Sequence, residues 1–229
     1  MTRAQGERLW SAASRVPDGG QIVEIGSFRG RSMIVLARAA TQAGTIVAID
    51  PHAGNDRGPQ EISGYEDAAE VDHQAFDRNL TQAGVRDRVT HVRAFSSAAH
   101  DDVRGTVDLL YIDGAHRYGP ARADVRDWGA RVVPGGTMLI HDSFSSVGVT
   151  LAILRELVPS RRWRYVGRSG SLTEYYAEPV DGTARRGNAL LQLRELPWFA
   201  RNVLIKVLIT AHLGRVTRIF GHDPSEWPY

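Results

Sequence analysis

Three short apolar segments that each end in an aspartate constrain the fold of this chain more than any other feature. They are residues 45–50 (T-I-V-A-I-D), 107–113 (V-D-L-L-Y-I-D) and 137–142 (T-M-L-I-H-D). Apolar strands separated by helical segments are typical of a parallel sheet that is covered on both faces. Ligands of such sheets bind beyond the carboxyl ends of the strands, so we expect Asp50, Asp113 and Asp142 to face one crevice.

The remaining segments continue the alternation of strands and helices. Further strands are predicted at 22–25, 88–95, 162–166 and 172–177, helices at 32–43, 72–83, 120–130 and 147–158, and a turn at 133–136. The expected fold is therefore α/β: a Rossmann-like, mostly parallel sheet of seven strands with helices on both faces, followed by a C-terminal helical extension.

Two segments depart from this compact pattern. Residues 51–71 form a long connection rich in Gly, Asp and Glu, and are predicted to be a lid or a disordered loop, with the lid favoured because the connection begins at the crevice. The last part of the chain is not needed by the core, so we divide it into a domain at 1–180 and an extension at 181–229. The extension is expected to be a helical pair that packs on the domain or on a second copy, or a surface for a lipidic acceptor or a membrane.

Composition excludes several kinds of chemistry. The chain has no cysteine, which excludes disulfides, thiolate metal sites and cysteine nucleophiles. Its one lysine, Lys206, lies in no P-loop, Schiff-base or dehydrogenase context. A formal charge of +2 over 229 residues does not indicate nucleic-acid binding, and no nucleic-acid partner is expected.

The apolar segments are too short for membrane insertion. Residues 1–10 contain no signal-peptide core, and the most apolar stretch, 203–210, cannot span a bilayer. We therefore expect a cytoplasmic protein without a transmembrane segment, with weak membrane contact through the extension as one alternative. A homodimer formed through apolar extension residues is the other expectation.

The first motif, Glu24-x-Gly26-x-x-x-Gly30, follows the first strand. Its glycines allow a sharp turn and a close approach to a ligand, and the N-terminus of the next helix favours a carboxylate. Asp50, about twenty residues beyond the turn, can accept hydrogen bonds from ribose hydroxyls. Together these features indicate an adenosyl ligand, although the spacing differs from the Gly-x-Gly-x-x-Gly pattern of dinucleotide-binding proteins.

With these motifs the chain resembles the class I methyltransferases that use S-adenosylmethionine (SAM). It is most similar to the bacterial group of macrolide-sugar O-methyltransferases and more distantly to catechol O-methyltransferase. The resemblance covers about residues 20–180 and is carried by V-E-I-G-S-F-R-G-R-S, V-A-I-D-P-H, D-L-L-Y-I-D-G-A-H-R-Y and P-G-G-T-M-L-I-H-D-S.

The resemblance implies a role for each motif position. Gly26 and Gly30 would line the methionine end of SAM, and Ser32 would bind its carboxylate. Asp50 would hold the ribose, and Ser96 would lie near the adenine. Glu24, Ser27 and Asp113 would also contact the cofactor. Asp113 and Asp142 would bind Mg²⁺ or another divalent cation, with Ser143 where relatives carry Asp or Asn, and His116 would be the general base. The implied reaction is methylation of a hydroxyl on a small or glycosyl acceptor, such as a polysaccharide or a natural product.

Other interpretations remain open. His116 could cap the following helix, Asp113 could be a capping acid, and His141 is interpreted as a structural residue or as a support for the ligands rather than as the base. A nicotinamide-dependent oxidoreductase would share the sheet and Asp50 but would need a third glycine and a Tyr/Lys pair. A non-catalytic protein with the same fold is the second alternative.

Overall fold

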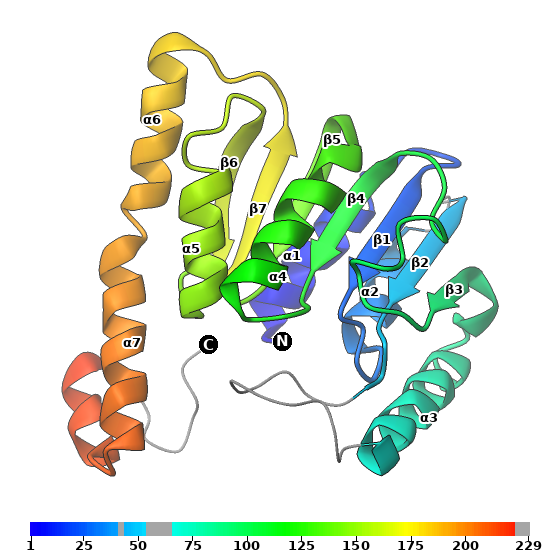
Figure 1. Cartoon of the computed structure of the whole chain (residues 1–229), viewed down its shortest axis with the longest axis horizontal. Coiled ribbons are helices and arrows are strands. Elements are labelled where there is room, and N and C mark those ends of the chain that lie inside the picture. Colours follow the sequence, from blue (N-terminus) through cyan, green and yellow to red (C-terminus); the bar gives the residue numbers. More distant parts are fainter. Residues whose placement is uncertain (41–43, 54–65, 223–229) are drawn as a thin grey trace.

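The computed structural model describes residues 1–40, 44–53 and 66–222, with side chains of the last range from residue 69 onward. Its centre is a seven-stranded sheet in the order β3-β2-β1-β4-β5-β7-β6 (Figure 1). The strands are β1 (Gln21–Ile25), β2 (Thr45–Ile49), β3 (Val89–Val92), β4 (Val107–Ile112), β5 (Val132–Ile140), β6 (Trp163–Ser169) and β7 (Leu172–Ala177). Pairing is parallel from β3 to β5, and β7 is antiparallel to both β5 and β6, which confirms the predicted fold class.

Helices cover both faces of the sheet (Figure 1). The α-helices are α1 (Arg3–Ala13), α2 (Arg31–Ala39), α3 (Glu66–Gln82), α4 (Tyr118–Ala123), α5 (Val147–Glu156), α6 (Gly182–Leu193) and α7 (Leu196–Thr210). Leu9, Met33 and Phe76 of the first three helices pack on one face, and Ala121 and Ile153 of α4 and α5 pack on the other. Strand residues alternate between these two cores, as expected for a sheet buried on both sides. In the described part of the chain, no helix is long and apolar enough to cross a membrane.

The predicted turn at 133–136 is wrong, because these residues belong to β5. The pairing of β4 with β5 shifts register between Val107 and Leu109, and Gly135 adopts a φ of 83°. A glycine with positive φ fits an extra residue in a strand, so the Pro-Gly-Gly sequence bends the strand instead of ending it.

Several predicted boundaries also change. The helix expected at 120–130 is α4 followed by a π-helical turn (Asp124–Trp128) and a 3₁₀ turn (Gly129–Arg131). Helix α3 begins at Glu66, so the end of the predicted 51–71 connection is helical, while its residues 54–65 lie outside the described range. The helix expected at 32–43 ends at Ala39, and residues 41–43 are likewise outside that range.

Helix α1 was not predicted from the sequence. Thr2 and Gln5 form a capping box at its start. Arg8 and Arg15 reach the sheet, where each lies 2.5 Å from an oxygen of Glu174 on β7. The helix is therefore fixed by long-range ion pairs as well as by its buried Leu9.

The extension packs on the outer edge of the sheet, and its predicted helical pair is confirmed as α6 and α7. Asn188 of α6 is buried and completes the hydrogen bonding of edge strand β6: it accepts from Tyr165 N at 2.7 Å and donates to Trp163 O at 2.9 Å. Trp198 and Phe199 of α7 pack against the core, and the Arg168 guanidinium lies 3.9 Å from the centroid of the Trp198 ring.

We predict that Asn188→Ala lowers the free energy of unfolding by about 2–5 kcal/mol, because it leaves two strand groups without a hydrogen-bond partner at a buried position. Urea denaturation followed by circular dichroism measures this change. Arg186→Ala, an exposed substitution in the same helix, is the matched control and should have little effect. A loss for Asn188→Ala as small as that of the control would contradict the role of this side chain.

Candidate active site

The candidate site lies where β1 and β4 are neighbours, at the point where the strand order reverses direction. The chain leaves β1 through Gly26, which has a φ of 88°. A Cβ at Gly26 would lie 2.2 Å from Asp113 O, so the backbone after β1 touches the backbone after β4. Gly30 has a different neighbour, since a Cβ there would lie 2.4 Å from Leu80 Cδ1 of α3. Gly26 is therefore required by close backbone packing, and Gly30 by its φ of 80°, which side chains disfavour.

Glu24 lies near the end of β1, next to this contact, with a fully buried carboxyl group. Neither carboxyl oxygen has a hydrogen-bond partner among the described residues, and the buried hydroxyl of Ser27 lacks one too. Burial raises the pKa of Glu24 to about 8; the hydroxyls of Ser32 and Ser27 oppose this shift, and the charges of Asp113 and Asp50 add to it. An unpaired buried carboxyl is costly, which indicates that this group faces a polar or cationic ligand.

Asp50 is held in the crevice by backbone groups. One oxygen accepts from Phe28 N at 2.7 Å and the other from His52 N at 2.8 Å. His52 is buried with a φ of 42°, and its Nε2 lies 2.7 Å from Phe28 O. The loops after β1 and β2 are thus joined through this acid, whose oxygens each keep lone pairs for a ligand.

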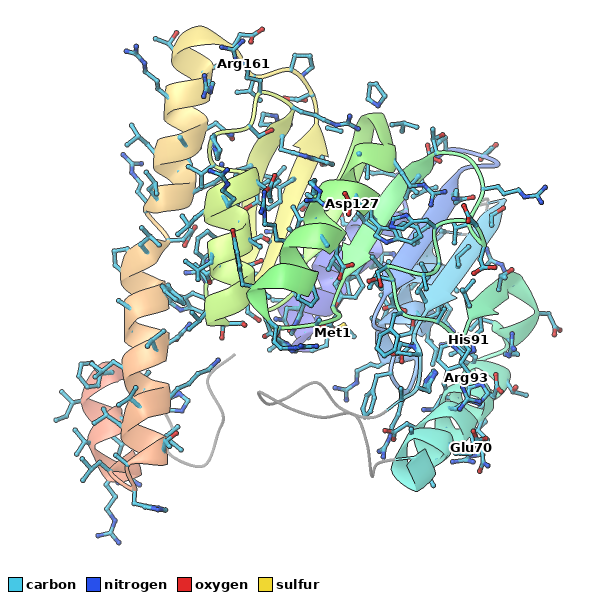
Figure 2. All side chains as sticks on the ribbon, in the orientation of Figure 1. Met1, Glu70, His91, Arg93, Asp127 and Arg161 are labelled. Carbon is cyan, nitrogen blue, oxygen red and sulfur yellow. The ribbon has the colours of Figure 1, made fainter. Side chains whose placement is uncertain are left out.

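A group of histidines supports Asp50 from the side of β3 and α3. The rings of His52, His73 and His91 lie 5.0–5.2 Å apart, centroid to centroid. Next to them Arg93 donates to Glu70 at 2.9 Å, and Figure 2 shows Glu70, His91 and Arg93 together at this edge of the molecule. Burial is the main reason that the pKa of His91 falls to about 4, so this ring is uncharged near neutral pH and contributes by packing.

Ser96 lies on the other side of the crevice, beyond β3. Its hydroxyl donates to the buried carboxyl of Asp124 at 2.5 Å. Burial raises the pKa of Asp124 to about 6, against the opposing effect of the Ser96 hydrogen bond. The carboxyl of Asp124 thus adds hydrogen-bond acceptors next to Ser96. The sequence predicts only Ser96 at this position.

Two acids and a histidine converge beside the crevice. One ligand atom each of Asp113, His141 and Asp142 lies within 4.8 Å of the others. His141 Nδ1 is 3.3 Å from Asp113 Oδ1 and 3.4 Å from Asp142 Oδ1, but it makes a directed hydrogen bond to neither. Burial favours the neutral ring, yet the two carboxylates outweigh it and raise the pKa of His141 to about 10. A buried nitrogen aimed between two carboxylates is an arrangement that can hold a cation.

The second oxygen of each acid is held by another side chain. Asp113 Oδ2 accepts from the Tyr111 hydroxyl at 2.8 Å, and Asp142 Oδ2 bonds His116 Nε2. The bond to Asp142 raises the pKa of His116. Burial works to raise the pKa of Asp142, but His116 and His141 together hold it well below its ordinary range. Asp113 and Asp142 therefore each direct one carboxylate oxygen toward His141 Nδ1, while a hydrogen bond holds the other oxygen in place.

Ser143 is not brought into this group. Asp142 and Phe144 both have a φ of 53°, and this backbone turns the intervening serine inward. The Ser143 hydroxyl donates to Ile140 O at 2.9 Å and lies 2.7 Å from the Thr173 hydroxyl. The third side chain beside the acids is His141, for which the sequence predicted a structural or supporting role and not that of a ligand.

The enclosed space at this point is small. A cavity of about 10 Å³, lined by Asp113, His116 and His141 among others, has room for roughly one water molecule. A small ligand such as a single ion matches this space, and a larger one must lie outside it.

We predict that Glu24→Gln changes how the stability of the ligand-free protein depends on pH. The folded-state pKa of Glu24 is raised from 4.5 to about 8, so its contribution is complete below pH 4.5 and is lost as the pH rises through 8. Glutamine cannot ionise, so between pH 5 and 9 the variant should gain roughly 3–5 kcal/mol relative to the wild type. Urea denaturation at several pH values measures this, and parallel curves for the two proteins would refute it; Glu7→Gln, at an exposed site, is the control.

Solved structures with a similar fold include methyltransferases of two kinds. One is the O-methyltransferase TomG of Streptomyces achromogenes, involved in tomaymycin synthesis and solved with SAM; it is 18% identical with a TM-score of 0.55 over 78% of this chain and 81% of that one. Another is an rRNA methylase of Streptococcus thermophilus, 14% identical with a TM-score of 0.52 over 78% of this chain and 98% of that one. At these identities the likeness shows the fold and leaves the acceptor undetermined.

Sequence comparison identifies the family. A relative, the uncharacterized protein y4gI of Sinorhizobium fredii, is 28% identical over 187 residues, which are 78% of this chain and 20% of that protein, so the chain spans about a fifth of the length of that relative. A family model described as a methyltransferase domain matches residues 23–143, more than half of the chain. The matched segment contains Glu24, Asp50, Asp113 and Asp142, and the chain belongs to this methyltransferase family, as its resemblance to SAM-dependent methyltransferases predicted.

Proposed function

We propose that this protein transfers the methyl group of SAM to a hydroxyl oxygen, with the help of a divalent cation and with His116 as the general base. The observation that carries the proposal is the convergence of Asp113, His141, Asp142 and His116 beside a crevice whose buried acid, Glu24, has no partner among the described residues. In this proposal residues 1–180 form the catalytic domain and 181–229 an extension beside it.

The crevice fits the parts of SAM. The unpaired carboxyl of Glu24 and the hydroxyl of Ser27 suit the amino group of the methionine end, and Ser32 in the first turn of α2 suits its carboxylate. Asp50 keeps lone pairs for the ribose hydroxyls, and Ser96 with Asp124 lies where the adenine would extend. When bound, SAM supplies an electrophilic methyl group on a positively charged sulfur. The surrounding acids favour binding of this positive charge.

Asp113, Asp142 and His141 would hold the cation, and His141 would release the proton that the two carboxylates favour, because only a neutral imidazole binds a metal. When bound, a divalent cation would orient the acceptor hydroxyl and lower its pKa. The donor set differs from the all-oxygen set expected from the sequence, because an imidazole nitrogen replaces the serine hydroxyl. Imidazole suits transition metals, while carboxylates suit both Mg²⁺ and Mn²⁺, so we favour Mn²⁺ over Mg²⁺.

His116 is positioned to accept the proton of the acceptor hydroxyl. Its Nε2 bonds Asp142 Oδ2, so a neutral ring with its proton on Nε2 keeps a lone pair on Nδ1. The carboxylate fixes the orientation of the ring and stabilises the imidazolium that forms. As the hydroxyl proton moves to Nδ1, the acceptor oxygen becomes nucleophilic enough to take the methyl group.

The proposed acceptor is a small or glycosyl compound with a free hydroxyl. The test incubates the purified protein with SAM and Mn²⁺ and with sugar, glycoside and catechol acceptors in parallel, and mass spectrometry detects products heavier by one methyl group. Formation of S-adenosylhomocysteine only when an acceptor is present supports the proposal. Tight binding of SAM without turnover of any acceptor would favour the non-catalytic alternative, and binding of a nicotinamide nucleotide in place of SAM would favour an oxidoreductase.

The cation site predicts a specific metal preference. Wild-type protein should bind Mn²⁺ more tightly than Mg²⁺ in calorimetry, and Asp142→Asn should weaken both by at least about tenfold. His141→Asp makes every donor an oxygen and should shift the preference toward Mg²⁺. Asp127→Asn, which changes an exposed acid paired with Arg126, is the control. Equal metal binding by wild type and Asp142→Asn would remove the cation from the proposal.

The role of His116 predicts a selective loss of turnover. His116→Ala should lower the rate by about 10²–10⁴-fold, the usual contribution of a general base, and should leave SAM affinity unchanged. His212→Ala, at an exposed site outside the crevice, should change neither quantity. If His116→Ala keeps more than about a tenth of the wild-type rate, another group removes the proton.

A further inference from the structure

The outer side of the extension is apolar where it meets solvent. Nine large apolar side chains are exposed, eight of them on α6, α7 and the 3₁₀ helix η4 (Gly214–Phe220) and one, Leu213, just before η4; their exposure runs from 37% for Phe220 to 80% for Ile219. They are Leu190, Leu191, Leu193, Leu204, Val207, Leu213, Val216, Ile219 and Phe220, and we call this set the extension surface. Exposed apolar side chains gathered on consecutive elements indicate a binding partner.

The extension surface does not result from a missing contact with the core. The inward sides of the same helices are used, since Asn188, Gln192, Asn202 and Ile205 are all buried. Arg201 donates to Phe220 O at 2.6 Å, which places the end of η4 beside α7. Figure 1 shows α6 and α7 running along one edge of the molecule, with η4 folded back beside the end of α7. The apolar side chains therefore belong to a folded helical edge that is already anchored.

The net charge of the extension distinguishes between two possible partners, a second copy of the chain and a lipid surface. Residues 182–222 contain seven basic residues and one acid, and the acid, Glu195, lies 2.6 Å from Arg168 of β6. Six of the basic residues are arginines (Arg185, Arg186, Arg194, Arg201, Arg215 and Arg218), and the seventh, Lys206, is turned inward to Ser145 O and does not count toward the outer charge. The next acids, Asp223 and Glu226, come only at the end of the chain. A second copy of the same surface would oppose this positive charge, whereas an anionic lipid surface complements it.

We propose that the extension surface binds peripherally to an anionic lipid bilayer. The apolar side chains enter the boundary between headgroups and acyl chains, and the arginines between them contact lipid phosphates. The binding is interfacial, since neither α6 nor α7 is long and apolar enough to cross a membrane. The proposal stands independently of methyl transfer, because it concerns only lipid binding.

Helix α7 also contacts a loop beside the candidate active site. On the inner side of α7, Asn202 Nδ2 donates to Phe144 O at 3.4 Å and Lys206 Nζ donates to Ser145 O at 2.9 Å. These carbonyls belong to the loop that follows Asp142. Binding to a bilayer would therefore hold the crevice at a fixed distance from the lipid surface.

The test measures binding of the full-length protein to vesicles by co-sedimentation. Vesicles of phosphatidylcholine alone are compared with vesicles that contain phosphatidylglycerol as well, at low and at high salt. Wild-type protein should bind the anionic vesicles, and salt should weaken this binding. Charge reversal in Arg215→Glu/Arg218→Glu should reduce the partition coefficient by at least about fivefold for each arginine.

The apolar contribution is tested with a matched pair of valines. Val207→Glu, at a side chain exposed by 57%, should abolish vesicle binding, whereas Val71→Glu on α3, exposed by 54%, should not. Ile219→Glu provides a second variant of the surface. Unchanged thermal unfolding of each variant confirms that it is folded.

Two results would overturn the proposal. One is the absence of wild-type binding to anionic vesicles at low salt, or binding that Val207→Glu and Ile219→Glu leave intact. The other is a wild-type dimer in light scattering that both variants convert to a monomer, together with no vesicle binding, which would assign the surface to a second copy of the chain.

Discussion

The backbone contact between Gly26 and Asp113 determines where every functional side chain of this protein can lie. At this contact the chain leaving β1 touches the chain leaving β4, at a distance that admits no side chain at position 26. The contact brings the Glu24 side of the crevice next to the strand end that carries Asp113. Because β5 pairs with β4 in parallel, Asp142 follows on the same edge of the sheet. The proposed cofactor site and the proposed cation site are thus neighbours as a direct result of strand order.

The site is built from groups that are costly to bury. Glu24 is buried with no partner among the described residues, and His141 lies between two carboxylates without a directed hydrogen bond to either. Buried polar groups of this kind destabilise a protein unless a ligand completes them. The surrounding structure keeps them in place: His52 and Phe28 fix Asp50, Tyr111 fixes Asp113, and His116 fixes Asp142. This arrangement is pre-organised for ligands whose charge is opposite to that of the acids.

Sequence alone predicted the parts of this structure that depend on local pattern. Continuous apolar strands ending in acids were sufficient to predict the sheet and the positions of Asp50, Asp113 and Asp142 just after its strands. Long-range effects were not predictable. Helix α1 has a weak apolar pattern and is held by Arg8 and Arg15 on Glu174, a partner more than 150 residues away in the chain. Likewise, no local signal distinguishes His141 from Ser143, because the choice depends on the left-handed backbone of Asp142, which directs the serine inward.

The loop after Asp142 links the site to the extension. Two of its residues, Asp142 and Phe144, hold left-handed conformations, which cost about 1–3 kcal/mol each and need support from their surroundings. Part of that support comes from α7, through the bonds of Asn202 and Lys206 to Phe144 O and Ser145 O. The inner side of α7 is therefore tied to the loop that carries Asp142, whereas its outer side chains can change independently. A lineage that replaced α7 to suit a new environment would also have to re-establish the loop that carries Asp142, so the two parts are expected to be inherited together.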